Sequence, residues 1–433
     1  MITRREVVRA LERQALADWV VVERDQELAV LDGRRGPSDP GAQREEHRTR
    51  WQLTIHADTP AGRGTSRVVV DARDGDPDQI VADAATLARL SVGPAWTTLP
   101  QAAPARVELA DPALVKGTAL QAASELAERL PQRAGATLET RITLLRERVA
   151  MQSHTGFQTA WHATLARLEA LVIVADRSLE VIREARRADG LELGATIDDA
   201  IADLRLLASA GAPVLGPCAL ILAGDALLHR GEGPRGAGGG LGVWDAFTSQ
   251  ADAVVARQGL TRYHERAVIA AGADQVAEPL SIKSSGASPF GVRSAPVGDD
   301  GDAVRTFMLV DQGIAAGLGL DPREAALLHR DPNGGVRNLS VALGTWDGKA
   351  VPAGVRVIEV RRLRGLAIDP YTGDGDLELA LAIDRTTGEA FTGGTVRLDL
   401  IDALARARRS ARQLHRGPYE GPAAVLIEHA DLH

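Results

Sequence analysis

Cysteine is almost absent from this chain of 433 residues, in which Cys218 is the single example. One thiol cannot form an internal disulfide or a cysteine-based zinc site, so neither stabilises the fold. Aromatic residues make up only 3% of the sequence, and the core must therefore be built from Ala, Leu, Val and Ile. No apolar run approaches the roughly 20 residues that cross a bilayer, and the charged N-terminal segment lacks the apolar stretch of a secretion signal. We therefore expect a cytoplasmic protein without membrane contact.

Lysine is also scarce, since it occurs only at Lys116, Lys283 and Lys349, and the basic residues are otherwise arginine. The formal net charge is −8, so the chain as a whole does not attract a polyanion. This balance argues against nucleic acid as a partner. The length is sufficient for two or three domains with a sizeable core.

The first half of the sequence predicts a mixed α+β domain over residues 1–210. Apolar periodicity, turn residues and acidic first turns assign the elements. Helices are expected over 3–17, 76–90, 112–130, 178–188 and 196–209, the last opened by Thr196. Strands are expected over 20–23, 28–31, 51–56 and 67–70, with a polar loop over 33–46 and a long hairpin over 137–174 that turns at 154–156.

The second half, residues 211–433, predicts a β-rich domain, because glycine becomes dense and short apolar runs alternate with turn residues. Near its end we expect a helix over 397–414 and a strand over 423–428. The glycine-rich stretch that contains residues 238–240 lacks the Gly-Lys-Ser/Thr ending of a phosphate-binding loop and is interpreted as a flexible loop.

The segment that bears most directly on function is residues 224–229 (GDALLH), which follows an apolar run. A zinc peptidase would place His-Glu-x-x-x-His at such a position, with two imidazoles as ligands and the carboxylate as general base. Here Gly224 stands for the first histidine, Asp225 for the glutamate, and His229 is the remaining histidine. Catalytic zinc needs three protein ligands and an open position for water, and His229 alone cannot hold it. We therefore expect no metal and no catalytic residue in this chain, and we interpret these three positions as vestigial.

Several other features have a simpler interpretation beside a functional one. Asp225 is expected to be a helix cap rather than a base, His229 to be solvent-facing or hydrogen-bonded, and Cys218 to be a buried, inert thiol. The arginine clusters at 361–364 and 406–416 are expected to be solvated faces or a subunit interface. The sequence around His264 fails the spacing of a zinc-peptidase motif.

Ser288, Phe290 and Arg293 are the candidates for a cleft that binds an extended peptide. The alternative is a turn in which Phe290 is a packing anchor.

A series of blocks in the second half is distinctive mainly through its order. The blocks are residues 278–282 (EPLSI), 288–294 (SPFGVRS), 298–301 (GDDG), 311–317 (DQGIAAG), 334–339 (GGVRNL) and 365–374 (GLAIDPYTGD). Over residues 211–400 this sequence resembles the TldD/PmbA family of peptidase-related proteins and, within it, the TldE-type (PmbA) chains. The resemblance implies a C-terminal domain of the TldD/PmbA type.

In that family, TldD-type chains carry the zinc motif and a later cysteine ligand, whereas TldE-type chains lack them and pair with a TldD-type chain. This chain departs from the catalytic pattern at Gly224 and Asp225 and has no cysteine after Cys218. The resemblance therefore implies a non-catalytic subunit of a heterodimeric zinc metallopeptidase that cleaves unfolded or precursor peptides. The zinc would belong to the TldD-type partner, and extended peptides would be the substrate. The alternatives are a self-sufficient, homodimeric metal-dependent peptidase with atypical ligands and a regulatory binding protein.

Overall fold

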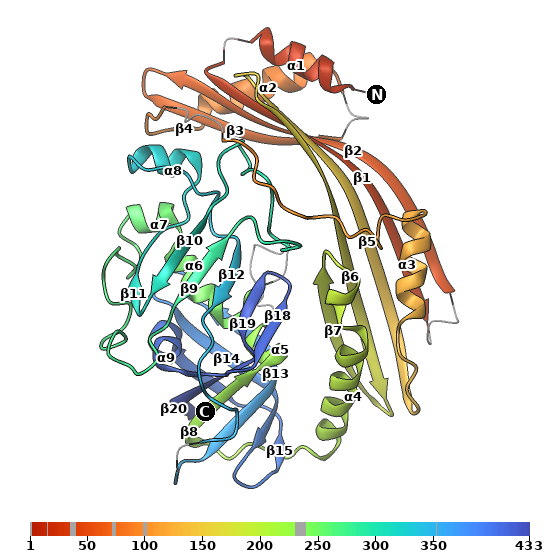
Figure 1. Cartoon of the computed structure of the whole chain (residues 1–433), viewed down its shortest axis with the longest axis vertical. Helices are drawn as coiled ribbons and strands as arrows, with labels where there is room; N and C mark the ends of the chain where they lie inside the picture. The colour runs from red at the N-terminus through yellow and green to blue at the C-terminus, as the bar shows by residue number, and fades with distance from the viewer. Residues whose placement is uncertain are drawn as a thin grey trace.

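The computed structural model describes residues 2–14, 16–34, 40–71, 75–97, 102–229, 240–351 and 353–433. A long, curved antiparallel sheet forms the N-terminal part, and two smaller sheets form the C-terminal part (Figure 1). The chain passes from one part to the other between Ser209, the end of α4, and Gly216, the start of β8. The expected mixed α+β fold, with a β-rich C-terminal part, is confirmed.

The N-terminal sheet has seven strands in the order β4-β3-β2-β1-β5-β6-β7. Their bounds are β1 (Asp18–Arg34), β2 (Pro40–Thr59), β3 (Gly62–Asp71), β4 (Val92–Gly93), β5 (Ala136–Ser153), β6 (Gln158–Val174) and β7 (Arg177–Ala185). The predicted hairpin between β5 and β6 is confirmed, with the turn at the expected place. β7 is an edge strand of this sheet, and its position places it beside the C-terminal part.

Four helices pack on one face of this sheet because alternate strand residues on that face are apolar. They are α1 (Arg4–Glu12), α2 (Pro77–Leu90), α3 (Ala119–Glu128) and α4 (Leu193–Ser209). Trp19, Val21, Ala29 and Leu31 of β1 are buried beneath them, whereas Arg24 and its neighbours on the opposite face are only partly covered. The sheet therefore has one apolar face. Its opposite face is apolar where Val20, Val22, Val149 and Met151 pack with Val297 of the C-terminal part, and it is largely polar and open elsewhere.

Five sequence-based expectations for this half were wrong in type or extent. The two strands expected at 20–23 and 28–31 are one strand, because the charged residues 24–27 continue β1 with side chains on its two faces. Part of the expected loop at 33–46 belongs to β1 and β2, and residues 178–188 are mostly strand β7 rather than helix. The expected helix at 112–130 is confined to α3, which starts after the Thr118 capping box. Helix α4 begins at Leu193, so Thr196 lies inside it and does not cap it.

The C-terminal part contains a six-stranded sheet, β11-β10-β9-β12-β19-β18, and a second sheet that closes on itself through pairing of β13 with β14. The bounds of the first are β9 (Ile282–Ser285), β10 (Thr306–Asp311), β11 (Ile314–Ala315), β12 (Asn338–Val341), β18 (Gln413–Arg416) and β19 (Tyr419–Pro422). Those of the second are β8 (Gly216–Ala223), β13 (Val357–Ile368), β14 (Asp374–Asp384), β15 (Ala390–Phe391), β16 (Thr395–Asp399), β17 (Arg408–Arg409) and β20 (Ala424–Leu432).

Short helices connect these strands, and one apolar cluster fills the space between the sheets. The helices are α5 (Gly224–Leu227), α6 (Asp245–Gln250), α7 (Ala253–Arg257), α8 (Pro322–Leu327) and α9 (Leu400–Arg406). The helix expected over 397–414 was wrong in extent, because after α9 the chain forms β17 and β18. The glycine-rich loop lies mostly outside the described residues. No helix in the described ranges has the length and apolarity of a membrane span.

Candidate functional site

The site expected to be vestigial lies where strand β8 ends and helix α5 begins. Gly224 has φ +51°, in the left-handed region that favours glycine, and a Cβ built there would meet nothing within 4 Å. Helix α5 is a single turn that ends at Leu227, so His229 lies beyond it. Asp225 is not the expected helix cap, because the N-cap is Ala223 and no side-chain cap bond forms. Its carboxylate points instead toward the N-terminal part.

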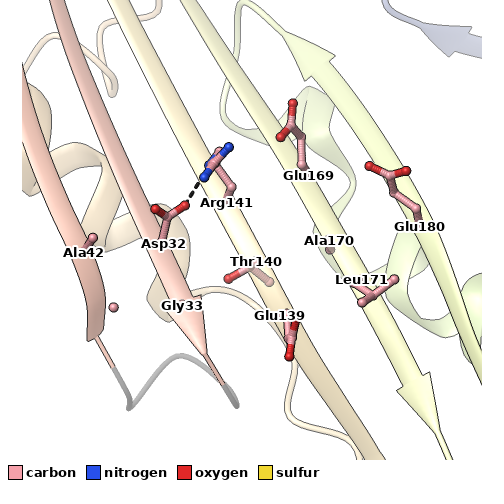
Figure 2. A pocket seen from close by; sticks show the side chains of 11 residues that line it. Asp32, Gly33, Ala42, Glu139, Thr140, Arg141, Glu169, Ala170, Leu171 and Glu180 are labelled. Carbon is pink, nitrogen blue, oxygen red and sulfur yellow. Dashed lines mark hydrogen bonds and ion pairs between the residues drawn. The ribbon is translucent and has the colours of Figure 1, made fainter. Parts of the chain in front are cut away.

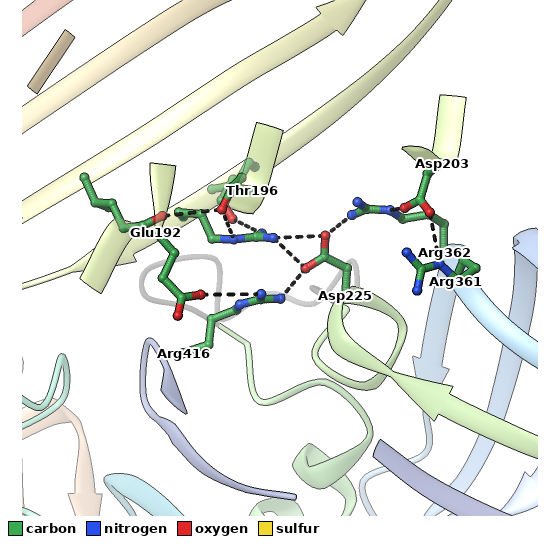
Figure 3. Close-up of polar contacts among 10 residues, drawn as sticks. Glu192, Thr196, Asp203, Asp225, Arg361, Arg362 and Arg416 are labelled. Atoms are coloured by element: carbon green, nitrogen blue, oxygen red, sulfur yellow. Dashed lines mark hydrogen bonds and ion pairs between the residues drawn. The ribbon is translucent and has the colours of Figure 1, made fainter. Parts of the chain in front are cut away.

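Three guanidinium groups converge on the Asp225 carboxylate (Figure 3). Arg183 of the edge strand β7 places Nη2 2.9 Å from one carboxylate oxygen and 3.1 Å from the other. Arg362 of β13 donates to Oδ2, and Arg416 of β18 donates to Oδ1. All four side chains are less than a fifth exposed. Such charge-assisted contacts are strong where water is largely excluded.

A second layer of contacts holds these arginines in place. Asp203 of α4 accepts from Arg361 at 3.0 Å and from Arg362 at 2.6 Å, and its own side chain is 2% exposed. The Thr196 hydroxyl accepts from Arg183 Nε at 3.1 Å. Because α4 and β7 belong to the N-terminal part and β13 and β18 to the C-terminal part, the network joins the two parts of the chain.

The arginines of the cluster carry charge that opposes the binding of a metal cation. Burial lowers the pKa of Arg183 and of Arg416 to about 10, which still leaves both guanidinium groups protonated at neutral pH. Burial also lowers the pKa of His229, which favours the neutral imidazole, the form in which histidine can ligate a metal. The cluster therefore presents fixed positive charge at the place where a zinc ion would add two more.

The residues at this position do not fit zinc. Gly224 offers no ligand, both oxygens of Asp225 are taken by guanidinium groups, and His229 is the single remaining donor. Within the described ranges, the three potential ligands that do lie within 4.8 Å of one another are Glu27, Glu45 and His47, on the N-terminal sheet. Glu27 already accepts hydrogen bonds from the Ala119 backbone N–H and from Arg146. These three residues are also distant in sequence from residues 224–229.

A pocket of about 260 Å³ opens beside the arginine cluster, and Arg183, Asp225, His229, Arg362 and Arg416 all line it. A second pocket of about 170 Å³ adjoins it, because Gly417 and Pro418 line both. The second pocket is polar, with Lys283, Ser285, Ser288, Ser340, His415 and Glu420 among its lining residues.

A wide hollow of about 790 Å³ lies on the open face of the N-terminal sheet (Figure 2). It is acidic, because Glu139, Glu169 and Glu180 line it and the charge of Asp32 is balanced by Arg141 at 2.7 Å. Glu180 of β7 also lines the arginine pocket. The hollow and the arginine pocket thus both border the edge strand β7 through Glu180, and the polar pocket adjoins the arginine pocket through Gly417 and Pro418.

The three residues predicted to line a peptide cleft have different surroundings. Ser288 lines the polar pocket. Phe290 has φ +53°, donates its backbone N–H to the Glu108 carbonyl and lies 5.3 Å from the Arg187 guanidinium. The Arg293 backbone N–H donates to Asn338, and Arg186 binds the neighbouring carbonyls. Phe290 and Arg293 therefore belong to the junction between the two parts, and the role of the three residues in peptide binding stays a prediction.

Sequence reasoning missed the residues that dominate the site. The arginines of 361–364 and 406–416 were expected on solvated faces or at a subunit interface, and the solvated face is wrong for Arg362 and Arg409, at 8% and 1% exposure. The one available sign was that Arg362 stands between the apolar Val360 and Leu363 in a strand-like run. Arg183 was assigned to a helix that does not form. Cys218, by contrast, is buried as predicted, and burial raises the pKa of its thiol to about 11.

The sequence and the fold were compared with known proteins. Residues 246–431 match the model of the PmbA/TldA metallopeptidase C-terminal domain. No curated protein matches the sequence of this chain.

Solved structures with the same fold include TldE from Thermococcus kodakarensis, at 12% identity and a TM-score of 0.74, covering 99% of each chain. A proposed modulator of a DNA gyrase from Thermotoga maritima has 14% identity and a TM-score of 0.72 over 100% of each chain. A similar protein from Bacteroides thetaiotaomicron has 13% identity and a TM-score of 0.75, over 100% of this chain and 99% of that one. The C-terminal domain of this chain thus belongs to the PmbA/TldD family, and the chain as a whole has the fold of the TldE structure.

Proposed function

We propose that this chain is the non-catalytic, TldE-like subunit of a heterodimeric TldD/TldE zinc metallopeptidase. The observation that carries the proposal is the arginine cluster: Arg183, Arg362 and Arg416 surround Asp225 at the position where a zinc peptidase needs its ligands and base. A carboxylate whose oxygens accept from three guanidinium groups has little capacity to activate a water. The zinc and the general base would come from the TldD-type partner.

The substrates of the complex would be unfolded or precursor peptides. An extended peptide can bind along a sheet edge through its backbone, a mode that tolerates many sequences. The edge strand β7, with its adjoining pockets and hollow, is a surface of suitable shape. We expect the complex to be cytoplasmic and to act without nucleic acid.

The test is co-expression with the TldD-type chain of the same organism, followed by affinity purification, size-exclusion chromatography and zinc analysis. We expect a heterodimer with one zinc per pair, which cleaves an unfolded casein fragment faster than the TldD-type chain does alone. If this chain neither associates with the TldD-type chain nor alters its cleavage, the proposal is wrong.

Zinc analysis of this chain purified alone separates the proposal from a self-sufficient peptidase. We expect near zero zinc per chain and no cleavage. A self-sufficient enzyme would instead hold about one metal per chain and lose its cleavage in His229→Ala.

A further inference from the structure

The arginine cluster has hydrogen-bonding capacity that the described residues do not use. A guanidinium carries five N–H donors, and Asp225 takes donors from only one nitrogen of each of its three arginines. Arg416 Nε is buried without an acceptor in the described part of the chain, and its nearest second carboxylate, Glu192, is 3.9 Å away from Nη2. A buried cationic donor without an acceptor is unfavourable, and an added anion would relieve it.

The pocket beside the cluster has room for a small anionic group. Its volume of about 260 Å³ is enough for a carboxyl-bearing side chain or a chain end, and its lining combines the three arginines with apolar residues such as Ile182 and Leu228. It shares the lining residue Glu180 with the acidic hollow, and it shares Gly417 and Pro418 with the polar pocket. A peptide lying along β7 would therefore pass the acidic hollow and then the arginine pocket.

We propose that the arginine pocket receives a carboxylate of an extended peptide, through Arg416 together with Arg183 and Arg362. This inference rests on the proposed role in peptide processing and adds a substrate preference to it. The carboxylate would be either the C-terminus of the peptide or an Asp or Glu side chain, since both have the same geometry for guanidinium donors.

Asp225 has a definite part in this inference, because its carboxylate already occupies the centre of the three arginines. Arg183, Arg361, Arg362 and Arg416 supply four positive charges, and Asp203, Asp225 and Glu192 supply three negative ones. A fourth carboxylate, Glu359, lies 3.4 Å from Arg361 and is shared with Arg385. An incoming carboxylate must share the guanidinium groups with Asp225 and is repelled by it. Removing an arginine and removing Asp225 should therefore change peptide binding in opposite directions, which a purely structural salt bridge would not do.

The first experiment uses the full chain and fluorescein-labelled Ala-Ala-Ala-Ala-Glu, with binding followed by fluorescence anisotropy at low salt. The matched peptides carry a C-terminal amide, a glutamine in place of the glutamate, or both changes. We expect the doubly neutral peptide to bind at least about tenfold more weakly. The single changes then show which carboxylate enters the pocket. Equal binding of all four peptides would overturn the inference, and this comparison needs no variant of the protein.

The second experiment compares three variants whose folding is checked by circular dichroism and thermal unfolding. Arg416→Gln should weaken binding of the acidic peptide several-fold, whereas Asp225→Asn should strengthen it. Arg412→Gln is the matched control, because Arg412 is an exposed arginine in the same segment that is not among the three guanidinium groups bound to Asp225, and it should bind as the wild type does. Weaker binding in Asp225→Asn, or an equal loss in Arg412→Gln, would contradict the inference.

Failure of this inference is distinguishable from failure of the proposed function. If the four peptides bind equally while the chain still assembles with its TldD-type partner, the pocket assignment is wrong and the subunit role stands. If the acidic peptide is preferred but no partner associates, the carboxylate pocket stands and the subunit role is wrong.

Discussion

Asp225 shows how much of a site depends on residues distant in sequence. The missing ligand at Gly224 and the shortened side chain at 225 can be read directly from the sequence, and they predict the loss of a metal site. The three arginines cannot be read in this way, because Arg183 precedes Asp225 by 42 residues and Arg416 follows it by 191. The sequence thus predicts the loss of a metal site, and the tertiary structure is needed to identify the arginines that surround Asp225.

Restoring the motif residues alone should not restore the metal. In the double variant Gly224→His, Asp225→Glu, the new histidine has space but must adopt a left-handed backbone conformation, at a cost of about 1–2 kcal/mol. The three guanidinium groups would still repel a dication and pair with the new carboxylate. After dialysis against micromolar zinc, we expect elemental analysis to find less than about 0.1 zinc per chain. Binding of about one zinc per chain would show that the arginines do not block the site.

Asp302 is a second residue whose environment has a measurable consequence. Its side chain is buried where the loop at 298–302 meets Arg337, and Oδ2 has no hydrogen-bond partner among the described residues. Burial, followed by the negative charge of Asp300, raises the pKa of the Asp302 carboxyl to about 7. The folded protein therefore keeps a proton on Asp302 up to about neutral pH.

This raised pKa predicts a loss of stability with rising pH. The unfolded chain releases the Asp302 proton near pH 4, roughly the reference value of a free aspartate, so the free energy of unfolding falls between about pH 4 and pH 7. The free energy of unfolding falls by at most about 4 kcal/mol, because each pH unit between the two pKa values contributes roughly 1.4 kcal/mol. Asp302→Asn removes this titration. Urea unfolding at pH 5.5 and 8 should show the variant gaining stability relative to wild type at the higher pH, and an unchanged difference would refute the assignment.

At the scale of elements, the sequence predicted helices and strands best where a regular apolar pattern continues over many residues. The β5–β6 hairpin and helix α2 were found because their patterns are long and their ends carry turn or capping residues. Strand β7 was taken for a helix because it is a short edge strand rich in charge, with Arg183 facing α4 and not solvent. Tertiary contacts of that kind override local preference.

Helix α4 is held to the C-terminal part by Asp203, which gives a prediction about this element. In Asp203→Asn, Arg361 and Arg362 lose a buried counter-charge, which should destabilise the protein by about 3 kcal/mol. The matched control is Asp198→Asn on the same helix, whose pair with Arg133 is half exposed and should matter little. Thermal unfolding of both variants tests this. A similar decrease in melting temperature for the two would show that burial of the Asp203 pair is not decisive.

At the scale of the whole molecule, composition and periodicity predicted a mixed first half and a β-rich second half, and the structure has both. The pairing of β8 with β13 and β20 and the contact between β7 and the C-terminal part could not be predicted, because partners that lie far apart in the chain leave no local pattern. The same limit explains why the order of distinctive blocks in the second half indicated a family while the site residues from the first half were missed.

The proposed absence of a metal leads to a prediction for the whole chain. Trp244, Phe247 and Tyr419 are buried in one apolar cluster with the strands of both C-terminal sheets, and we expect this core to be stable without a metal. Treatment of the purified chain with EDTA, followed by its removal, should leave the melting temperature within about 1 °C of the untreated value. Calcium-loaded EDTA is the control for effects of the chelator itself. Because a structural zinc site contributes folding energy directly, a decrease of several degrees that zinc reverses would mean that this chain holds a metal at a place its ligands do not reveal.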